Sequence, residues 1–501
     1  MNMSWLIIVT ILMPVLGAVL LLLKPYRADR TTVRILTGST VVGTLCLTIA
    51  VALLSEPEIR IFELLPNVPL YFRVDSVGKF FSLLTVAMWT CSTMFSFEYM
   101  NHQEKEERYS TFSLFALGSL LGACYSGNLV TTYVFYEMMT LSTFPLVMHE
   151  QKRESISAGL TYLYYSLAGA FLGLIGIFFL YADSAETTRT GGRLAYVAGG
   201  FLKENMSGSQ TSTLLVIVFL MLVGIGSKVG MFPLHGWLPK AHPVAPASAS
   251  ALLSGNITKI GILFILRVVY YSVGASFLNG TWVQYALLSL ALLTVFLGSM
   301  LAFREKVFKK RLAYSTVSQT SYILTGLYLF VPMAATGALM HVLFHSIIKN
   351  LLFLCAGAVI YKTGKTKVEE LKGIGRQMPV TMWCFTFGAL ALVGIPPFSA
   401  FVSKWYLAVG ALETDTGVFR YLVPVILLIS ALLTAGYLLT ITADAFFRPR
   451  QDGEEPENVT GTEGTFRMLI PVLLLAGAAL VFGIVTSPLT DFLESIVSTI
   501  L

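Results

Sequence analysis

The stretch GIGSKVGMFPLHGWLP, residues 224–239, decides how this chain is interpreted, and GIPPFSAFVSKW, residues 394–405, shares its layout. Each stretch interrupts a long apolar segment with Gly and Pro and carries one Lys. Pro lacks a backbone donor and clashes with the preceding helical turn, so it breaks or kinks a helix. In a bilayer, a broken helix is tolerated only where protein or water satisfies the freed backbone groups. We therefore predict two broken helices that face a polar interior.

The two predicted breaks lie five helices apart, by the helix ranges given below. Because five is odd, equivalent helices would run in opposite directions, which is the pattern of an inverted repeat. We predict repeats at 110–273 (spans 4–8) and 281–447 (spans 9–13). A three-helix segment at 1–109 precedes them, and an inner loop with a last span follows at 448–501. Two ordinary proline kinks are the simpler alternative.

The composition is that of a membrane protein. Of 501 residues, 55% are hydrophobic and 12% are charged, about half the charged fraction of a soluble protein. This excludes a soluble enzyme, a disordered protein and a nucleic-acid-binding domain. With ~20 apolar residues per crossing, we predict an all-α polytopic membrane protein with about 14 transmembrane helices. Their predicted ranges are 4–23, 33–54, 76–98, 110–127, 129–148, 155–182, 212–232, 246–273, 281–303, 312–331, 334–361, 379–409, 420–447 and 467–488.

Basic residues gather in loops on one predicted side of the membrane. They lie at 24–34, 152–153, 304–311, 362–376 and 448–450. Positively charged loops usually stay in the cytoplasm, so this pattern accounts for the net charge of +6 without a nucleic-acid partner. Both termini are then predicted on the outer face of a prokaryotic cytoplasmic membrane. Residues 4–23 lack a basic start and a cleavage site, and are predicted to be a retained span.

No segment indicates a cofactor site. The five cysteines lie in apolar segments without a C-x-x-C pair, so we predict packing residues and no disulfide, Fe–S or zinc site. No phosphate-binding glycine motif opens a helix after a strand. The chain is therefore predicted to bind neither NADH, flavin nor ATP, and to perform no redox chemistry itself.

Two ionisable groups of the first repeat are predicted to act as a pair. Glu137 lies in the middle of the fifth span and Lys228 in the seventh. An ionisable group near the bilayer centre is expensive and therefore tends to be functional. A carboxylate and an ammonium lower each other's desolvation cost, and losing the contact changes the proton affinity of both. We predict a charge switch, with a purely structural ion pair as the alternative.

Lys259, in the eighth span, is the predicted central proton carrier. No acid is close to it in sequence, and a buried Lys without a fixed counter-ion readily exchanges its proton near neutral pH. Snorkelling to an interface is the alternative. Arg267, nearer the outer end, is predicted to snorkel, and Asp75 is predicted to be interfacial.

His341, His345 and Lys349 are spaced i, i+4, i+8 and so share one helix face. Histidine changes charge near neutral pH, and both ring nitrogens can carry a proton. A relay through bound water is predicted. A metal site and a hydrogen-bonded structural role are alternatives, although the same segment offers no Asp, Glu or Cys as a further ligand.

Lys404 follows the second break by seven residues and is predicted to end the series of titratable groups. Its alternative role is an interfacial anchor beside Trp405. His235 and His242 flank the first broken helix and are predicted to lie in a loop near the inner mouth, although His235 could also serve proton entry.

The run SKVGMFPLHGWLPKAHPVAPASASALLSG, residues 227–255, resembles the signature of a large family. This family contains the antiporter-like subunits of respiratory complex I, the large subunits of Mrp-type cation/proton antiporters, and counterparts in membrane-bound hydrogenases. The resemblance extends over about residues 70–447. It implies 14 helices with two inverted five-helix repeats. It also implies a charge-switch pair at Glu137 and Lys228, a central Lys259, a polar axis at His341 and His345, and a terminal Lys404.

Within the family, the length resembles the shorter members: the mid-arm complex I subunit, the second large Mrp subunit or a hydrogenase counterpart. No room is expected for a long amphipathic helix after the last span. Because Lys ends the predicted axis, we favour the Mrp and hydrogenase branch.

We therefore predict a subunit of a multi-subunit membrane complex that moves protons, with coupling to Na+ left open. The predicted partners are other membrane subunits, including a second homologous antiporter-like subunit, and either a redox module (hydrogenase or dehydrogenase) or an opposing ion gradient as the driving force. Two other hypotheses are the membrane subunit of an inorganic-carbon uptake complex, and a structural arm subunit whose charges serve packing.

Overall fold

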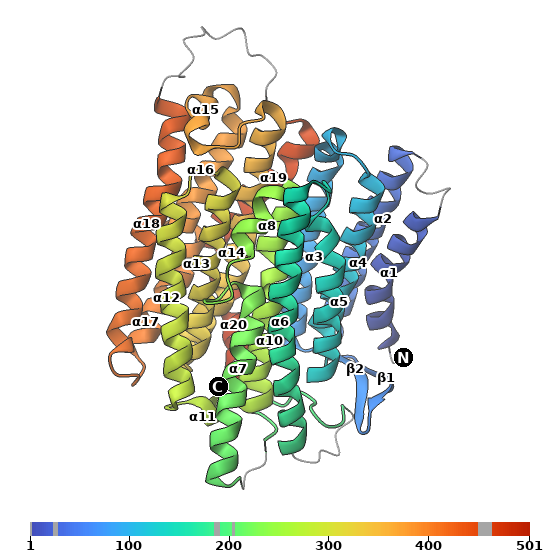
Figure 1. The fold of residues 1–501 in the computed structure, drawn as a ribbon, viewed down its shortest axis with the longest axis vertical. Coiled ribbons are helices and arrows are strands. Elements are labelled where there is room, and N and C mark those ends of the chain that lie inside the picture. The colour runs from blue at the N-terminus through green and yellow to red at the C-terminus, as the bar shows by residue number, and fades with distance from the viewer. Residues whose placement is uncertain (1–2, 24–28, 185–190, 203–205, 449–462) are drawn as a thin grey trace.

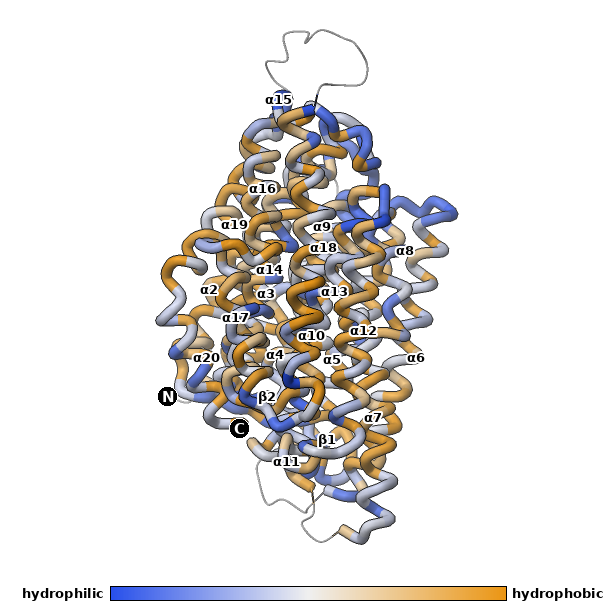
Figure 2. Tube along the Cα trace, turned by 90° about the vertical axis from the view of Figure 1, so that its left-hand side faces the viewer, coloured by the Kyte–Doolittle hydropathy of each residue, from blue (hydrophilic) through white to orange (hydrophobic). Residues whose placement is uncertain are grey.

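The computed structural model describes residues 3–23, 29–184, 191–202, 206–448 and 463–501. Helices run roughly parallel to the long axis and form a tall bundle (Figure 1). Within the described residues, ten helices are long and apolar enough to cross a membrane. Hydrophobic residues dominate the middle of the bundle, and hydrophilic ones gather toward its two ends (Figure 2). The chain is thus a mostly helical, multi-pass membrane protein.

In the first part of the chain, a small hairpin connects the second helix to the third. Its elements are α1 (Trp5–Leu22), α2 (Arg30–Ala52), β1 (Glu58–Leu65), β2 (Val68–Arg73), α3 (Ser76–Tyr99) and the 3-10 turn η2 (Met100–His102).

The next part ends in one long helix that contains two π-helical stretches. Its elements are α4 (Glu106–Tyr125), α5 (Leu129–Val147), α6 (Arg153–Asp183), α7 (Gly208–Val229), α8 (Leu238–Val244), α9 (Ala247–Leu252), η3 (Leu253–Ile257), α10 (Thr258–Leu266), η4 (Arg267–Val273) and α11 (Ala275–Leu278).

The remaining elements are α12 (Trp282–Arg304), α13 (Phe308–Tyr328), α14 (Pro332–Thr363), η5 (Val368–Leu371), α15 (Ile374–Gln377), α16 (Pro379–Val393), α17 (Ser399–Leu412), α18 (Phe419–Phe447), α19 (Phe466–Ile484) and α20 (Ser487–Ile500). Every helix range predicted from the sequence overlaps helix, mostly with ends shifted by a few residues; the range 379–409 holds α16 and α17 on either side of the break, and 467–488 runs past the end of α19 into α20.

Both predicted breaks are present. The helix α7 ends at Val229 and α8 begins at Leu238, while α16 ends at Val393 and α17 begins at Ser399. Each break opens on a glycine in the left-handed region, Gly230 (φ 88°) and Gly394 (φ 89°). Glycine adopts this conformation without a steric penalty, which makes it the common residue after a helix end.

The hairpin was not predicted. The strands β1 and β2 pair antiparallel around Asn67, whose positive φ of 59° suits a tight turn. The predicted helix ranges left this connection between the second and third spans without an element. The amphipathic helix α20 was also missed. It buries one apolar face, including Leu493, Ile496 and Val497.

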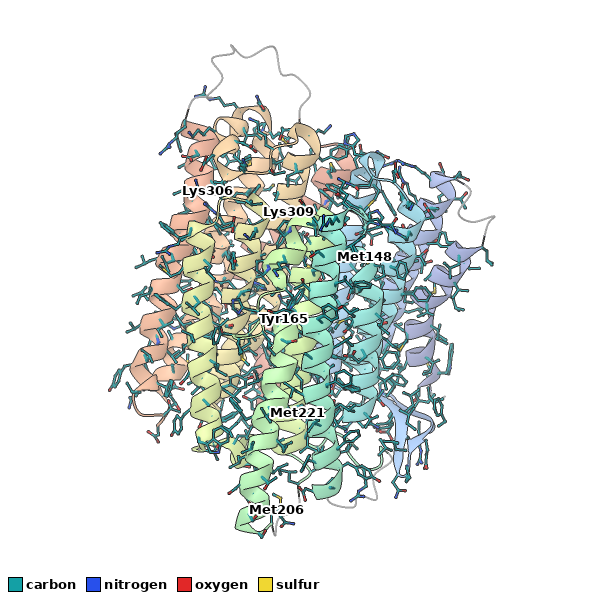
Figure 3. All side chains as sticks on the ribbon, in the orientation of Figure 1. Met148, Tyr165, Met206, Met221, Lys306 and Lys309 are labelled. Carbon is teal, nitrogen blue, oxygen red and sulfur yellow. The ribbon has the colours of Figure 1, made fainter. Side chains whose placement is uncertain are left out.

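The basic loops that the structure describes gather at one end of the bundle. Lys306, Lys309 and Met148 lie toward that end, and Met206 lies at the opposite one (Figure 3). The chain ends lie in the other half of the bundle (Figure 1). Parts of two predicted basic runs, 24–28 and 449–450, lie outside the described residues, as does most of the predicted inner loop after 448.

Arg267 does not snorkel: it is buried and paired with Asp75, the partly exposed residue that caps α3. The Arg267 side chain is 2% exposed and makes two bonds to the Asp75 carboxylate, of 2.5 and 2.7 Å. Its guanidinium also lies over the rings of Tyr196 and Tyr271, at 5.0 and 4.7 Å from their centroids. The ion pair joins the start of α3, where Asp75 also accepts from the Gly78 amide, to the end of the long helix. The protein tolerates burial of the Arg267 charge because the Asp75 carboxylate pairs with it.

We expect Arg267→Met to destabilise the fold by about 3–5 kcal/mol, because it leaves the Asp75 carboxylate unpaired in a largely buried site. The double variant Asp75→Asn/Arg267→Met should recover much of this loss, since Asn can still cap α3. Thermal unfolding in detergent, followed by thiol-reactive fluorescence, measures both. Equal unfolding temperatures for Arg267→Met and the unmodified protein would contradict the ion pair's role.

Candidate functional site: a row of buried lysines and histidines

The interior of the bundle holds a row of ionisable side chains that come from α7, α10, α14 and α17. Five of its members are buried: Lys228, Lys259, His341, His345 and Lys349. Lys404 is partly buried. Uncompensated burial of a charged group is prohibitive, so the partners of each group reveal how the protein stabilises it.

Lys228 is held by hydroxyl groups. Its ammonium donates to Thr140 (2.8 Å), Tyr162 (3.1 Å) and Ser166 (2.8 Å). Lys228 lies in the last turn of α7, where the unpaired carbonyls of the helix end favour a cation. The break at Gly230 therefore sets the position of the lysine. The Ser227 hydroxyl beside it donates to the carbonyl of Tyr165, at mid-height of the bundle (Figure 3).

Glu137 makes no direct ion pair with Lys228. Its Oε1 atom is buried and has no hydrogen-bond partner, while the ammonium uses its three donors on hydroxyls. Glu137 lies one helical turn from Thr140 on α5, next to the exposed Met138. Glu137 and Lys228, which were predicted to pair, are thus neighbours without direct contact. Lys228 binds the Thr140 hydroxyl, which lies one turn after Glu137 on α5.

Lys259 and His345 are joined directly. The Lys259 ammonium lies 2.5 Å from Nδ1 of His345 and donates to the Ser254 carbonyl at 2.8 Å. Ser254 lies in the π-helical stretch η3, and such stretches often occur at functional sites because they change the backbone pairing. Depending on the tautomer of the ring, either Lys259 or Nδ1 of His345 is the donor at this contact. The Nε2 atom of His345 is buried and has no partner.

His341 continues the row toward α17. Its Nδ1 contacts the Ser403 hydroxyl at 2.9 Å and its Nε2 contacts Oε1 of Gln319 at 3.1 Å. The ring stacks on Tyr322, and its centroid lies 6.0 Å from that of His345. A side chain bonded at both ring nitrogens can receive a proton on one and release it from the other.

Lys404 caps a helix that is not its own. Its ammonium donates to the carbonyls of Leu392 (2.6 Å) and Val393 (2.9 Å), the last two residues of α16. These carbonyls lack partners within the helix because α16 ends before Gly394. Lys404 also faces the Tyr322 ring at 5.2 Å. The second break therefore provides the oxygen atoms that hold the lysine, which spacing alone did not predict.

Lys349 binds a neighbouring helix and no other ionisable member of the row. It donates to the Leu312 carbonyl (3.0 Å) and the Ser315 hydroxyl (2.5 Å) of α13. His235 lies half-buried between α7 and α8, next to Phe232, with Nδ1 unbonded. His242 was predicted to lie in a loop, but it belongs to α8 and is fully buried. Hydropathy could not reveal this, because the packing of α13 and α14 over α8 buries it.

Within the part of the chain that the structure describes, no three His, Cys, Asp or Glu side chains gather in a group that could hold a metal ion. The row consists of lysines, histidines, hydroxyls and backbone carbonyls. The lysines and histidines of such a row can bind and release protons, while the hydroxyls and carbonyls hold them by hydrogen bonds.

These features define a multi-pass membrane protein with a set of buried ionisable side chains. The chain belongs to the family described as NADH:quinone oxidoreductase/Mrp antiporter, transmembrane, whose model matches residues 126–434.

Its curated relatives include an NADH-quinone oxidoreductase subunit of Desulforudis audaxviator, which is 33% identical over 377 residues, covering 75% of this chain and 72% of the relative. A Na(+)/H(+) antiporter subunit of Alkalihalophilus pseudofirmus is 29% identical over 462 residues, covering 91% and 90%. A hydrogenase-4 component of Escherichia coli is 33% identical over 350 residues, covering 67% and 50%.

Solved structures share the fold. A chain of the Mrp complex from Dietzia sp. superposes with a TM-score of 0.85 at 22% identity, covering 100% of this chain and 98% of the other. A chain of respiratory complex I from Thermus thermophilus gives 0.78 at 22% identity, covering 99% and 100%. Both belong to multi-subunit membrane complexes, so this fold occurs in chains that have neighbouring subunits.

We expect Gly169→Ala to disturb the Lys228 site, because an added Cβ would lie 2.3 Å from the Gly224 carbonyl and 2.5 Å from the Ser227 hydroxyl. The resulting separation of α6 and α7 should destabilise the protein by about 1–3 kcal/mol and move Tyr162 and Ser166 away from Lys228. Thermal unfolding measures the loss.

Gly173→Ala is the matched control, since its Cβ would meet only a side-chain atom of Ile225 at 3.7 Å. Equal destabilisation by the two variants would contradict close α6–α7 packing as the cause.

Proposed function

We propose that this chain is a proton-translocating subunit of a multi-subunit membrane complex. One observation carries the proposal: a row of titratable side chains, each held by a defined partner, runs through the bundle from the first broken helix to the second. Lys228 and Lys404 stand at the two breaks, and Lys259 contacts His345 between them. The relatives whose names include Na(+)/H(+) antiporter and NADH-quinone oxidoreductase support the same function.

In the proposed architecture, 14 helices cross the membrane as a three-helix segment at 1–109, inverted repeats at 110–273 and 281–447, and a last span in 448–501. The similar design of the two breaks supports the repeats, since each places a glycine with positive φ at a helix end beside a lysine. The end with the basic loops faces the cytoplasm, and both chain ends lie outside, in keeping with the bias of positive charge.

Proton transfer begins at Lys228 in this proposal. Glu137 stands one turn from the Thr140 hydroxyl that Lys228 binds, so its charge state changes the stability of the lysine charge without direct contact. The helices that carry Lys228 and Lys259 touch, because a Cβ at Gly261 would lie 3.3 Å from Cβ of Lys228. A proton reaching Lys259 passes to Nδ1 of His345 along the 2.5 Å contact.

From His345 the proton continues to His341. The ring centroids are 6.0 Å apart, a gap that one bridging water spans. His341 is bonded to Ser403, the neighbour of Lys404. Lys404 accepts the proton while it is neutral, and the α16 carbonyls then hold its ammonium more strongly; release of the proton weakens this hold. The second break thus responds to the arrival and release of a proton.

We expect Lys259→Ala to reduce coupled proton transport at least tenfold per assembled complex, because His345 loses the partner that supplies its proton. The measurement is fluorescence quenching by a pH-sensitive dye in inverted membrane vesicles, scaled to the amount of complex on a native gel. Lys306→Ala is the control: Lys306 is exposed and pairs only at the surface with Glu369.

A Lys259→Ala complex that assembles normally and transports protons at the full rate would contradict the proposal. A purely structural role for the charges predicts a different result. In that case Glu137→Gln and Lys228→Met would lower the amount of complex and leave transport per complex unchanged.

The proposed partners are a second homologous membrane subunit and an energy source. Purification of the tagged chain in mild detergent, followed by mass spectrometry, distinguishes two assemblies. We expect a second large homologue with small membrane proteins, as in an Mrp-type antiporter. Recovery of Fe–S and nickel- or flavin-containing subunits would instead place the chain in a redox-driven pump. Recovery of the chain alone would contradict a multi-subunit complex.

A further inference from the structure

His242 is a buried histidine without hydrogen bonds. It lies on α8, has no exposed surface and stacks on Phe353, with ring centroids 4.6 Å apart. Neither Nδ1 nor Nε2 has a partner. A buried polar atom left unbonded costs about 1–3 kcal/mol, so an apolar side chain would pack here at lower cost. A functional role would explain why the site holds a histidine.

Two lysines from different helices lie near His242. Lys349 precedes Phe353, the ring on which His242 stacks, by one turn of α14, and Lys309 comes from α13. Lys309 donates to the Ala245 carbonyl at 2.6 Å, which ties α13 to the chain three residues after His242. Lys349 interacts in turn with Lys259 and His345. His242 therefore lies between a lysine near the end of the bundle and the centre of the row.

A polar surface pocket lies on the far side of Lys309 from His242. Glu150 interacts electrostatically with Lys309. It lines a pocket of about 340 Å³ formed by residues 102–105 and 149–152. Lys309 and Met148, which adjoins this pocket, lie toward the same end of the bundle (Figure 3). The pocket wall includes His149, whose pKa is lowered to about 4 by burial and by the nearby Arg108, so this histidine stays neutral at physiological pH.

We infer that Lys309, His242 and Lys349 form a second proton-entry branch, which leads from the pocket at 102–105 and 149–152 to the Lys259–His345 contact. The branch rests on the proposed function and joins the row at its centre, without passing Lys228. A proton taken from pocket water moves by way of Glu150 and Lys309 to one ring nitrogen of His242, and leaves from the other toward Lys349. Each step transfers one proton between two bases, and the charge moves with it.

The flanking lysines limit the branch to one proton at a time. A cationic His242 between two ammonium groups is strongly disfavoured in a site of low dielectric. The histidine can therefore accept a proton only when a neighbouring lysine is neutral. A Lys349 that has just passed its proton to the row provides that condition, so the branch refills the centre after each transfer.

The test compares variants in the complete complex in inverted membrane vesicles. We expect His242→Phe to lower proton transport at least fivefold per assembled complex, and His242→Gln to do the same. A structural role would tolerate one of the two, since Phe preserves the ring stacking and Gln preserves a polar group. Phe353→Leu, which alters packing against the same ring, is the control and should transport at close to the normal rate.

Lys309→Met should lower transport to a similar extent, and the double variant His242→Phe/Lys309→Met should be no slower than the slower single variant, because both block one route. If substitutions of His242 prevent assembly, Glu150→Gln still tests the branch, because Glu150 is partly exposed. This variant should slow proton transport at least twofold. A normal rate for Glu150→Gln and Lys309→Met would overturn the branch.

Lys259→Ala, measured in parallel, separates the two proposals. Normal transport by His242→Phe with loss in Lys259→Ala overturns the branch and leaves the proposed function standing. Normal transport by both variants overturns both.

Discussion

The structure depends on how a helical bundle keeps ammonium groups stable in its interior. An apolar environment makes a free charge prohibitive, and within the described residues no acid pairs directly with Lys228, Lys259 or Lys404. Hydroxyls surround Lys228, a carbonyl of a π-helical stretch and a histidine nitrogen hold Lys259, and two carbonyls of a helix end hold Lys404. The carbonyls that hold Lys259 and Lys404 are available because their helices are locally rewound or broken, whereas the hydroxyls that hold Lys228 are side chains of α5 and α6. The same irregularities that weaken the bundle therefore make room for its ionisable groups.

The two breaks solve this problem in different ways. At the first, Lys228 lies on the helix that ends there, and its charge meets the end of its own helix together with side chains from α5 and α6. At the second, Lys404 lies beyond the break on α17 and reaches back to α16. In the second case the contact holds two half-helices together, so a change in charge at Lys404 acts on the break itself. The first site responds through hydroxyl orientation, while the second can respond through the backbone.

Sequence was sufficient for the long helices and for both breaks, because hydropathy and the positions of Gly and Pro are local properties. It was also sufficient to place Lys259, His341 and His345 on the inside. It failed where a partner comes from a distant segment. The Arg267–Asp75 pair spans 192 positions, and nothing local distinguishes a buried arginine from one that snorkels. The carbonyl partners of Lys404 belong to the backbone and leave no side-chain signal. His242 was expected in a loop because its short helix is covered by α13 and α14, whose packing the sequence does not express.

Electrostatic repulsion among the cations of the row makes the positions of the protons depend on one another in the proposed transport. His345 interacts with Lys259, Lys349, His341 and Lys404 together, so all of these groups cannot carry a charge at the same time in a poorly screened interior. A proton that enters at one point therefore disfavours a proton elsewhere in the row. Entry from the side of Lys228 pushes charge toward Lys404, and entry at the centre through Lys349 would push it toward either end. With a second entry at the centre, net movement to one side requires that Lys228 be already charged when the centre fills. The state of Glu137, which supports that charge, would then decide which way the proton leaves.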